Sequence, residues 1–264
     1  MEKYKNEEYL KNTIMEQDRH LFIYGYDSDY RSEFLQNMEK SYPIMFDSLK
    51  PVALYFDSLG MPKIDASLEN KDKYLIYTMS KEYLHFTIAT KIMEKSMQLD
   101  ETLLDTKLQR LFYLMNISNS SIKIETSRHL LSELKISRDF YYEKYIDYVK
   151  GLIGEVSFDD VSLPFLQLEM FVKQYKRGMN IDSHFGIIFD KKGYISIPST
   201  QAINDLISKR VSDDISIKIA VKPDNWQVYT DTNGQFIERV HDYGMVELDD
   251  SYKVFIKTLK RSNY

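Results

Sequence analysis

Short apolar runs alternate with longer amphipathic stretches along this chain, which predicts strands interleaved with helices. Residues 20–24 (HLFIY) and 184–190 (HFGIIFD) are rich in aromatic and β-branched side chains. Runs of this kind suit central parallel strands that are buried on both faces. Further runs cover residues 52–56, 215–221 and 243–248. The alternation predicts an α/β fold with a mainly parallel sheet flanked by helices.

The stretch from about residue 70 to 150 has a different character. It contains almost no Gly or Pro and places Leu, Ile, Met and Tyr at three- and four-residue spacings. This pattern predicts several helices, with breaks near residues 98–101 and 117–121. We therefore predict a single domain over residues 1–264 that carries a helical insert at about 70–150.

Three further helices follow from local signals. The polar N-terminal residues 1–19 place Tyr9, Leu10 and Ile14 on one side, and we expect a helix that packs before the first strand. Pro164 and Gly178 bracket an amphipathic stretch, which predicts a helix with the proline near its first turn and the glycine at its end. Ser199 and Thr200 are the expected caps of a helix through residues 202–207.

The link after the first apolar run resembles a phosphate-binding loop. That loop has Gly, four residues, Gly, Lys and then Ser or Thr, so that backbone N–H groups surround the phosphates and the Lys reaches the terminal ones. In this frame Gly25 is the first glycine and Ser32 the hydroxyl residue, whereas Tyr30 and Arg31 replace the second glycine and the lysine. An ordinary strand, turn and helix is the alternative interpretation.

The replacements change the chemistry of the loop. A tyrosine tolerates positive φ poorly, and the planar head of an arginine differs from a lysine ammonium. Asp27 and Asp29 inside the loop would also repel a triphosphate. These residues favour a site that has lost hydrolytic activity.

The run at residues 184–190 ends in an acid, Asp190. In phosphate-loop ATPases an acid at the carboxyl end of a central strand holds magnesium together with the loop hydroxyl. The metal ligands predicted in this way are Ser32 and Asp190. Lys191 follows, where active hydrolases usually carry a glutamate that polarises water, and a charged lysine cannot act as that base.

Composition narrows the classes of protein further. The chain has no cysteine, which excludes disulfides and thiolate metal sites, and its five histidines are too scattered for a metal signature. A formal net charge of −5 gives no general attraction to nucleic acid. We find neither a signal peptide nor an apolar stretch long enough to span a bilayer, so we expect a cytoplasmic protein.

The order of elements resembles the core of AAA-type ATPases, and in particular of bacterial ATPases related to origin-recognition proteins. The similarity spans about residues 20–250: FGIIFDKKGYIS resembles their magnesium-acid strand, and the segment from residue 217 to 250 resembles their sensor strand and last core strand. The resemblance implies a P-loop NTPase-like fold. It also implies ATP or ADP with magnesium as cofactor. The implied binding residues are Gly25, Arg31, Ser32, Asp190 and Asn225 or Asp224.

Our leading hypothesis is a degenerate nucleotide-binding module, a pseudo-ATPase, that acts through protein partners, with DNA-associated or defence machinery suggested by family analogy alone. The alternative is a structural or adaptor protein that keeps the P-loop NTPase fold without binding nucleotide. An active ATPase in which Arg31 replaces the lysine is a third hypothesis. An intact ATPase subunit is a possible partner, and contact with nucleic acid rests only on family analogy. The 21 tyrosines, several of them in the helical insert, favour protein–protein contact.

Overall fold

Five parallel strands form one sheet in the order β2-β3-β4-β1-β5 in this computed structural model. The structure describes residues 2–25, 27–57, 71–118, 123–158, 163–191, 195–208, 214–222, 225–239 and 241–248. The strands are β1 (His20–Gly25), β2 (Val52–Phe56), β3 (Phe185–Asp190), β4 (Ile215–Val221) and β5 (Tyr243–Leu248). Each predicted apolar run is therefore a strand, and the predicted α/β class with a parallel sheet is confirmed.

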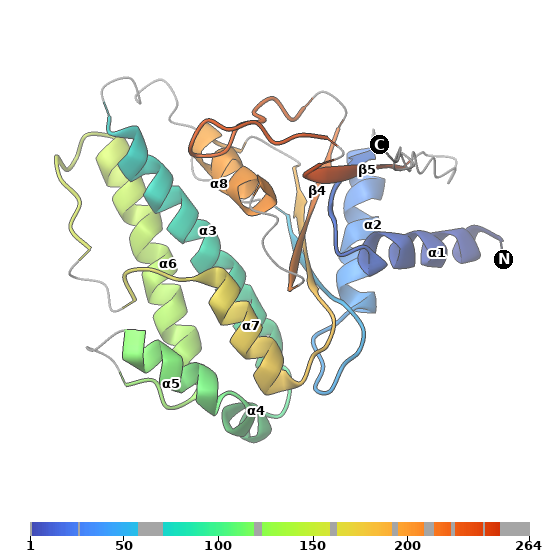
Figure 1. The fold of residues 1–264 in the computed structure, drawn as a ribbon, viewed down its shortest axis with the longest axis horizontal. Helices are drawn as coiled ribbons and strands as arrows, with labels where there is room; N and C mark the ends of the chain where they lie inside the picture. Colours follow the sequence, from blue (N-terminus) through green and yellow to red (C-terminus); the bar gives the residue numbers. More distant parts are fainter. Residues whose placement is uncertain are drawn as a thin grey trace.

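Helices cover both faces of the sheet (Figure 1). They are α1 (Glu2–Glu16), α2 (Ser28–Ser41), α3 (Lys73–Ser96), α4 (Glu101–Lys107), α5 (Gln109–Ser118), α6 (Ser127–Val149), α7 (Leu168–Met179) and α8 (Ile197–Ser208). Helices α3 to α6 occupy the predicted helical stretch. The predicted break near residues 98–101 falls between α3 and α4, whereas most of the one near 117–121 lies outside the described residues. None of the helices in the described ranges is long and apolar enough to cross a membrane.

The side chains of β1 show how the two faces are separated. Successive side chains of a strand point to opposite faces, so Leu21 and Ile23 pack with α1 and α2 on one side. Phe22 points the other way, into the larger core built with α3, α6, α7 and α8. Figure 1 shows the same division, with α1 and α2 on one side of the sheet and the longer helices on the other. Because both faces are covered, β1 to β4 are apolar almost throughout, as parallel strands require.

The ends of α7 differ from the prediction. The helix begins at Leu168, so Pro164 lies in the segment before the helix and not in its first turn. Gly178 lies inside the helix, where a Cβ would come within 2.6 Å of the carbonyl oxygen of Lys107. The glycine is therefore needed for close approach to α4. Asn180, with φ of 57°, ends the helix in the left-handed conformation.

The start of α8 also differs. Ser199 and Thr200 lie within the first turns of the helix and are buried. Ser196 precedes it, and its Oγ accepts a hydrogen bond from the backbone N–H of Ser199 at 3.3 Å. The cap was therefore predicted about one turn too late, because several hydroxyl residues in this stretch offer the same capping chemistry.

Candidate functional site at the carboxyl edge of the sheet

The predicted site residues come from two strands that are not neighbours. β4 separates β1 from β3, and Asp190 at the end of β3 lies level with Ala220 of β4. Helix α2 starts three residues after Gly25 and carries Arg31 and Ser32 in its first turns. Because the strands are parallel, the carboxyl ends of β1 and β3 lie at the same edge of the sheet. Helix α2, which follows β1, brings the side chains of Arg31 and Ser32 to Asp190.

Arg31 and Asp190 form a buried ion pair. Both Nε and Nη2 of Arg31 lie 3.0 Å from Oδ1 of Asp190. Nη1 donates to the carbonyl oxygen of Gly25 at 2.7 Å, and Nη2 reaches the carbonyl oxygen of Lys191 at 3.5 Å. The side chains of Arg31 and Asp190 are 1% and 0% exposed. The arginine therefore points into the protein and binds groups of its own chain.

The other carboxylate oxygen of Asp190, Oδ2, accepts hydrogen bonds from two hydroxyl groups. Ser32 donates its Oγ–H to Oδ2, and Tyr55 of β2 donates to the same atom at 3.0 Å. Burial raises the pKa of Tyr55, and the neighbouring charge of Asp190 raises it further. Tyr55 was not among the predicted site residues. The signal for it in the sequence is one polar-tipped residue within an otherwise apolar strand, VALYF.

Asp27 occupies the start of α2. Its carboxylate accepts the backbone N–H groups of Asp29 at 2.8 Å and of Tyr30 at 3.0 Å. These hydrogen bonds lower the pKa of Asp27. The first N–H groups of a helix are those that bind phosphate in nucleotide sites. Here an acidic side chain of the same chain already binds two of them.

Comparison with known proteins identifies the family. The model of the ORC-CDC6-like family matches residues 56–261, which is more than half of the chain. The chain belongs to the ORC-CDC6-like family. Comparisons with curated proteins and with solved structures gave no match. The family confirms the predicted resemblance to origin-recognition-like ATPases and relates the chain to AAA-type ATPases, which bind nucleotide with magnesium.

The site of this ORC-CDC6-like chain does not fit a magnesium-bound nucleotide in the arrangement described. A carboxylate offers about four lone-pair positions, and Asp190 accepts hydrogen bonds from one N–H and two O–H groups and forms an ion pair with Nη2 of Arg31. A Cβ placed on Gly25 would lie 3.3 Å from Cδ of Arg31, so the arginine fills the space next to the glycine. Within the described residues, no three His, Asp or Glu side chains form a group that could hold a metal ion.

Lys191 and Asn225 lie next to the Arg31–Asp190 pair, and their side chains form no hydrogen bond with Asp190 among the described residues. The Nζ of Lys191 donates to the backbone carbonyl oxygen of Asn225 and lies 5.5 Å from the centre of the Trp226 ring. Burial lowers the pKa of Lys191. Asn225 is exposed and takes part in this contact through its backbone, whereas Asp224 lies outside the described residues. The structure thus joins Gly25, Arg31, Ser32 and Asp190 directly, and brings Asn225 near them only through Lys191.

Proposed function

We propose that this chain is a pseudo-ATPase, an ATPase-related module that keeps the P-loop fold, does not turn over ATP and acts through protein partners. One observation carries the proposal: the guanidinium of Arg31 and the carboxylate of Asp190 bind each other where an ATPase would bind phosphate and magnesium. In this arrangement the Arg31–Asp190 ion pair occupies the place of the nucleotide phosphate and its magnesium ion.

Two further features support the absence of turnover. Asp27 binds two N–H groups at the start of α2 and places a negative charge where a phosphate would lie. Lys191 stands at the position from which a glutamate would polarise water, and its ammonium is held by the carbonyl oxygen of Asn225. Asp27 therefore does not favour phosphate binding, and Lys191 does not provide a base that could activate water.

The geometry favours a module that does not require nucleotide. A nucleotide could reach Ser32 and Asp190 only after the buried Arg31–Asp190 pair had separated, and separating a buried pair leaves an uncompensated charge. An adaptor role is therefore better supported than nucleotide-dependent switching. The net charge of −5 offers no general attraction to nucleic acid, so we propose protein partners, an intact ATPase subunit among them.

Phosphate release from ATP in the presence of magnesium tests the absence of turnover. The purified protein is compared with its Asp190→Ala variant, which measures the background from contaminating ATPases. We expect the two rates to be equal. A rate for the parent protein that clearly exceeds that of Asp190→Ala would overturn the proposal.

A further inference from the structure

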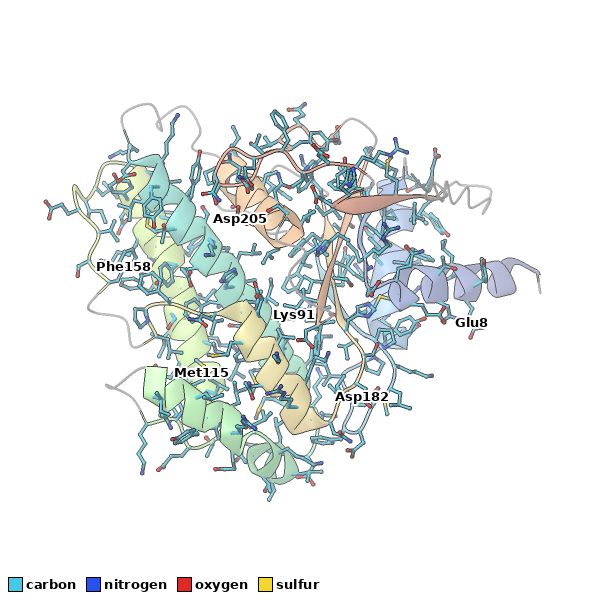
Figure 2. All side chains as sticks on the ribbon, in the orientation of Figure 1. Glu8, Lys91, Met115, Phe158, Asp182 and Asp205 are labelled. Atoms are coloured by element: carbon cyan, nitrogen blue, oxygen red, sulfur yellow. The ribbon has the colours of Figure 1, made fainter. Side chains whose placement is uncertain are left out.

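A groove between α1 and α2 lies on the outer side of the sheet, apart from the Arg31–Asp190 pair. It encloses about 660 Å³. Figure 2 shows one of its residues, Glu8, on α1 where this helix projects from the body of the molecule. The lining residues that bear on its chemistry are Glu7, Glu8, Lys11, Tyr30, Glu33 and Lys50.

The floor of the groove is aromatic. Tyr30 stands where the phosphate-loop motif has its second glycine, and its ring lies 6.3 Å from that of Phe34, centre to centre. Phe34 is buried against the sheet, whereas Tyr30 is only half-buried. Tyr30, which replaces the glycine of the motif, thus lines the groove between α1 and α2. Aromatic faces attract cations through the negative charge above the ring.

The groove already holds one cation of its own chain. The Nζ of Lys11 lies 2.8 Å from Oε1 of Glu7 and 5.8 Å from the centre of the Phe34 ring. A carboxylate and an aromatic face, the two elements of a cation site, thus both contact Lys11. The contacts of Lys11 show how a carboxylate and an aromatic ring in this groove bind a basic side chain.

Two acids are left to bind a further cation. Glu8 and Glu33 are exposed, and neither forms an ion pair with the residues whose side chains are described. With Lys11 compensated by Glu7, the one other cation in the lining is Lys50. Burial raises the pKa of Tyr42 at the end of the groove, and the charges of Glu16 and Glu8 raise it further, which agrees with a negative potential here.

We propose that this groove binds a basic segment of a partner protein, with an Arg or Lys side chain over Tyr30 and its charge between Glu8 and Glu33. The inference rests on the proposed function in one respect, that the chain acts through protein partners. It does not depend on the state of Asp190. Peptide binding therefore tests the groove, and nucleotide turnover tests the proposed function independently.

Fluorescence anisotropy with a labelled peptide of alternating Arg and Ser provides the test. The variant Glu8→Gln/Glu33→Gln removes the two acids of the groove that form no ion pair with the described side chains. The control variant Glu143→Gln/Glu169→Gln removes two exposed acids elsewhere, so both proteins have the same net charge. A second peptide with Glu in place of Arg reports on the sign of the preference.

We expect the Arg peptide to bind the parent and the control equally, and the groove variant about tenfold more weakly, since two exposed ion pairs are lost. Tyr30→Leu should weaken binding further while the protein stays folded. Equal weakening in the groove and control variants would show an effect of net charge alone and overturn the proposal. Absence of binding to the parent, or equal binding of the Glu peptide, would also overturn it.

Discussion

The Nε of Arg31 donates to Oδ1 of Asp190 over 3.0 Å, although the two residues are 159 positions apart in the chain. Removal of the arginine leaves a buried carboxylate without its counter-charge. We expect Arg31→Ala to lower the free energy of unfolding by about 3 to 5 kcal/mol. Arg31→Lys should also destabilise, because a compact ammonium lacks the planar fork with which the guanidinium spans Asp190 and the carbonyl groups of Gly25 and Lys191.

Urea denaturation followed by circular dichroism measures both effects. Arg110→Ala is the matched control, because Arg110 is exposed. It should change stability by less than about 0.5 kcal/mol. Equal stabilities of Arg31→Ala and Arg110→Ala would contradict the role assigned to the buried ion pair.

The hydroxyl of Tyr55 provides a second test of the network. Tyr55→Phe removes one donor to Oδ2 of Asp190 and leaves that of Ser32 in place. We expect a loss of about 1 kcal/mol in the free energy of unfolding. Tyr74→Phe, at a side chain that is 79% exposed, should have no effect. A Tyr55→Phe protein as stable as the parent would show that this hydrogen bond contributes nothing.

The edge strand β2 is protected by side chains from both layers. Glu39 of α2 accepts the backbone N–H of Tyr55 at 3.0 Å, while Lys91 of α3 donates to the carbonyl oxygen of the same residue. Lys91 and Lys95 also lie 3.1 Å and 3.0 Å from the carboxylate of Glu39. Figure 2 shows Lys91 between the long helices and the sheet. The backbone of β2 is thereby closed to pairing with another strand at this residue.

Replacement of Glu39 should therefore reduce stability and expose the edge. We expect Glu39→Ala to cost about 1 to 2 kcal/mol, because a backbone N–H and two lysines lose their acceptor. Thermal unfolding measures the loss, and light scattering during the same experiment reports aggregation. Glu94→Ala, which removes an exposed pair with Lys135, is the control. A Glu39→Ala protein that unfolds at the same temperature as this control would contradict the prediction.

Two buried histidines predict how stability depends on pH. Burial, with the nearby charge of Lys218, lowers the pKa of His20 and of His184 from 6.5 to about 4. Between these values the unfolded chain binds more protons than the folded one, so stability rises with pH over this range. Acidification from pH 6.5 to pH 4 should remove up to about 3 kcal/mol for each histidine.

Urea denaturation at pH 7 and at pH 5 tests this dependence. We expect His184→Gln to lose less stability on acidification than the parent, because one of the two proton-binding differences is gone. His241→Gln, at an exposed histidine, should retain the full dependence. A parent protein that is equally stable at both pH values would contradict the assignment of His20 and His184.

The strands were predictable because a parallel sheet covered on both faces needs continuous apolar runs, and those at residues 20–24 and 215–221 have no other equally simple interpretation. The helical stretch was predictable from spacing alone. Helix ends were less predictable: Gly178 lies inside α7, where it allows close contact with α4, and a tertiary contact leaves no local signal in the sequence.

The structure brings together several residues that the sequence predicted as a site, and their binding of a ligand stays a prediction. Motif spacing led to Arg31, Ser32 and Asp190, yet a pattern of residues cannot tell whether an arginine points toward a ligand or toward its own chain. Tyr55 was missed because β2 carries no part of the motif. The capping role of Asp27 follows from its place before α2, whereas its effect on the phosphate contacts required the geometry.

Calorimetric titration of the purified protein with ATP and with ADP, with and without magnesium, tests most directly whether the Arg31–Asp190 pair takes the place of the ligand. The same titrations on Asp190→Ala show whether any binding uses this site. We predict no saturable heat for the parent protein under any of these conditions. Saturable binding of nucleotide to the parent that Asp190→Ala abolishes would contradict the account.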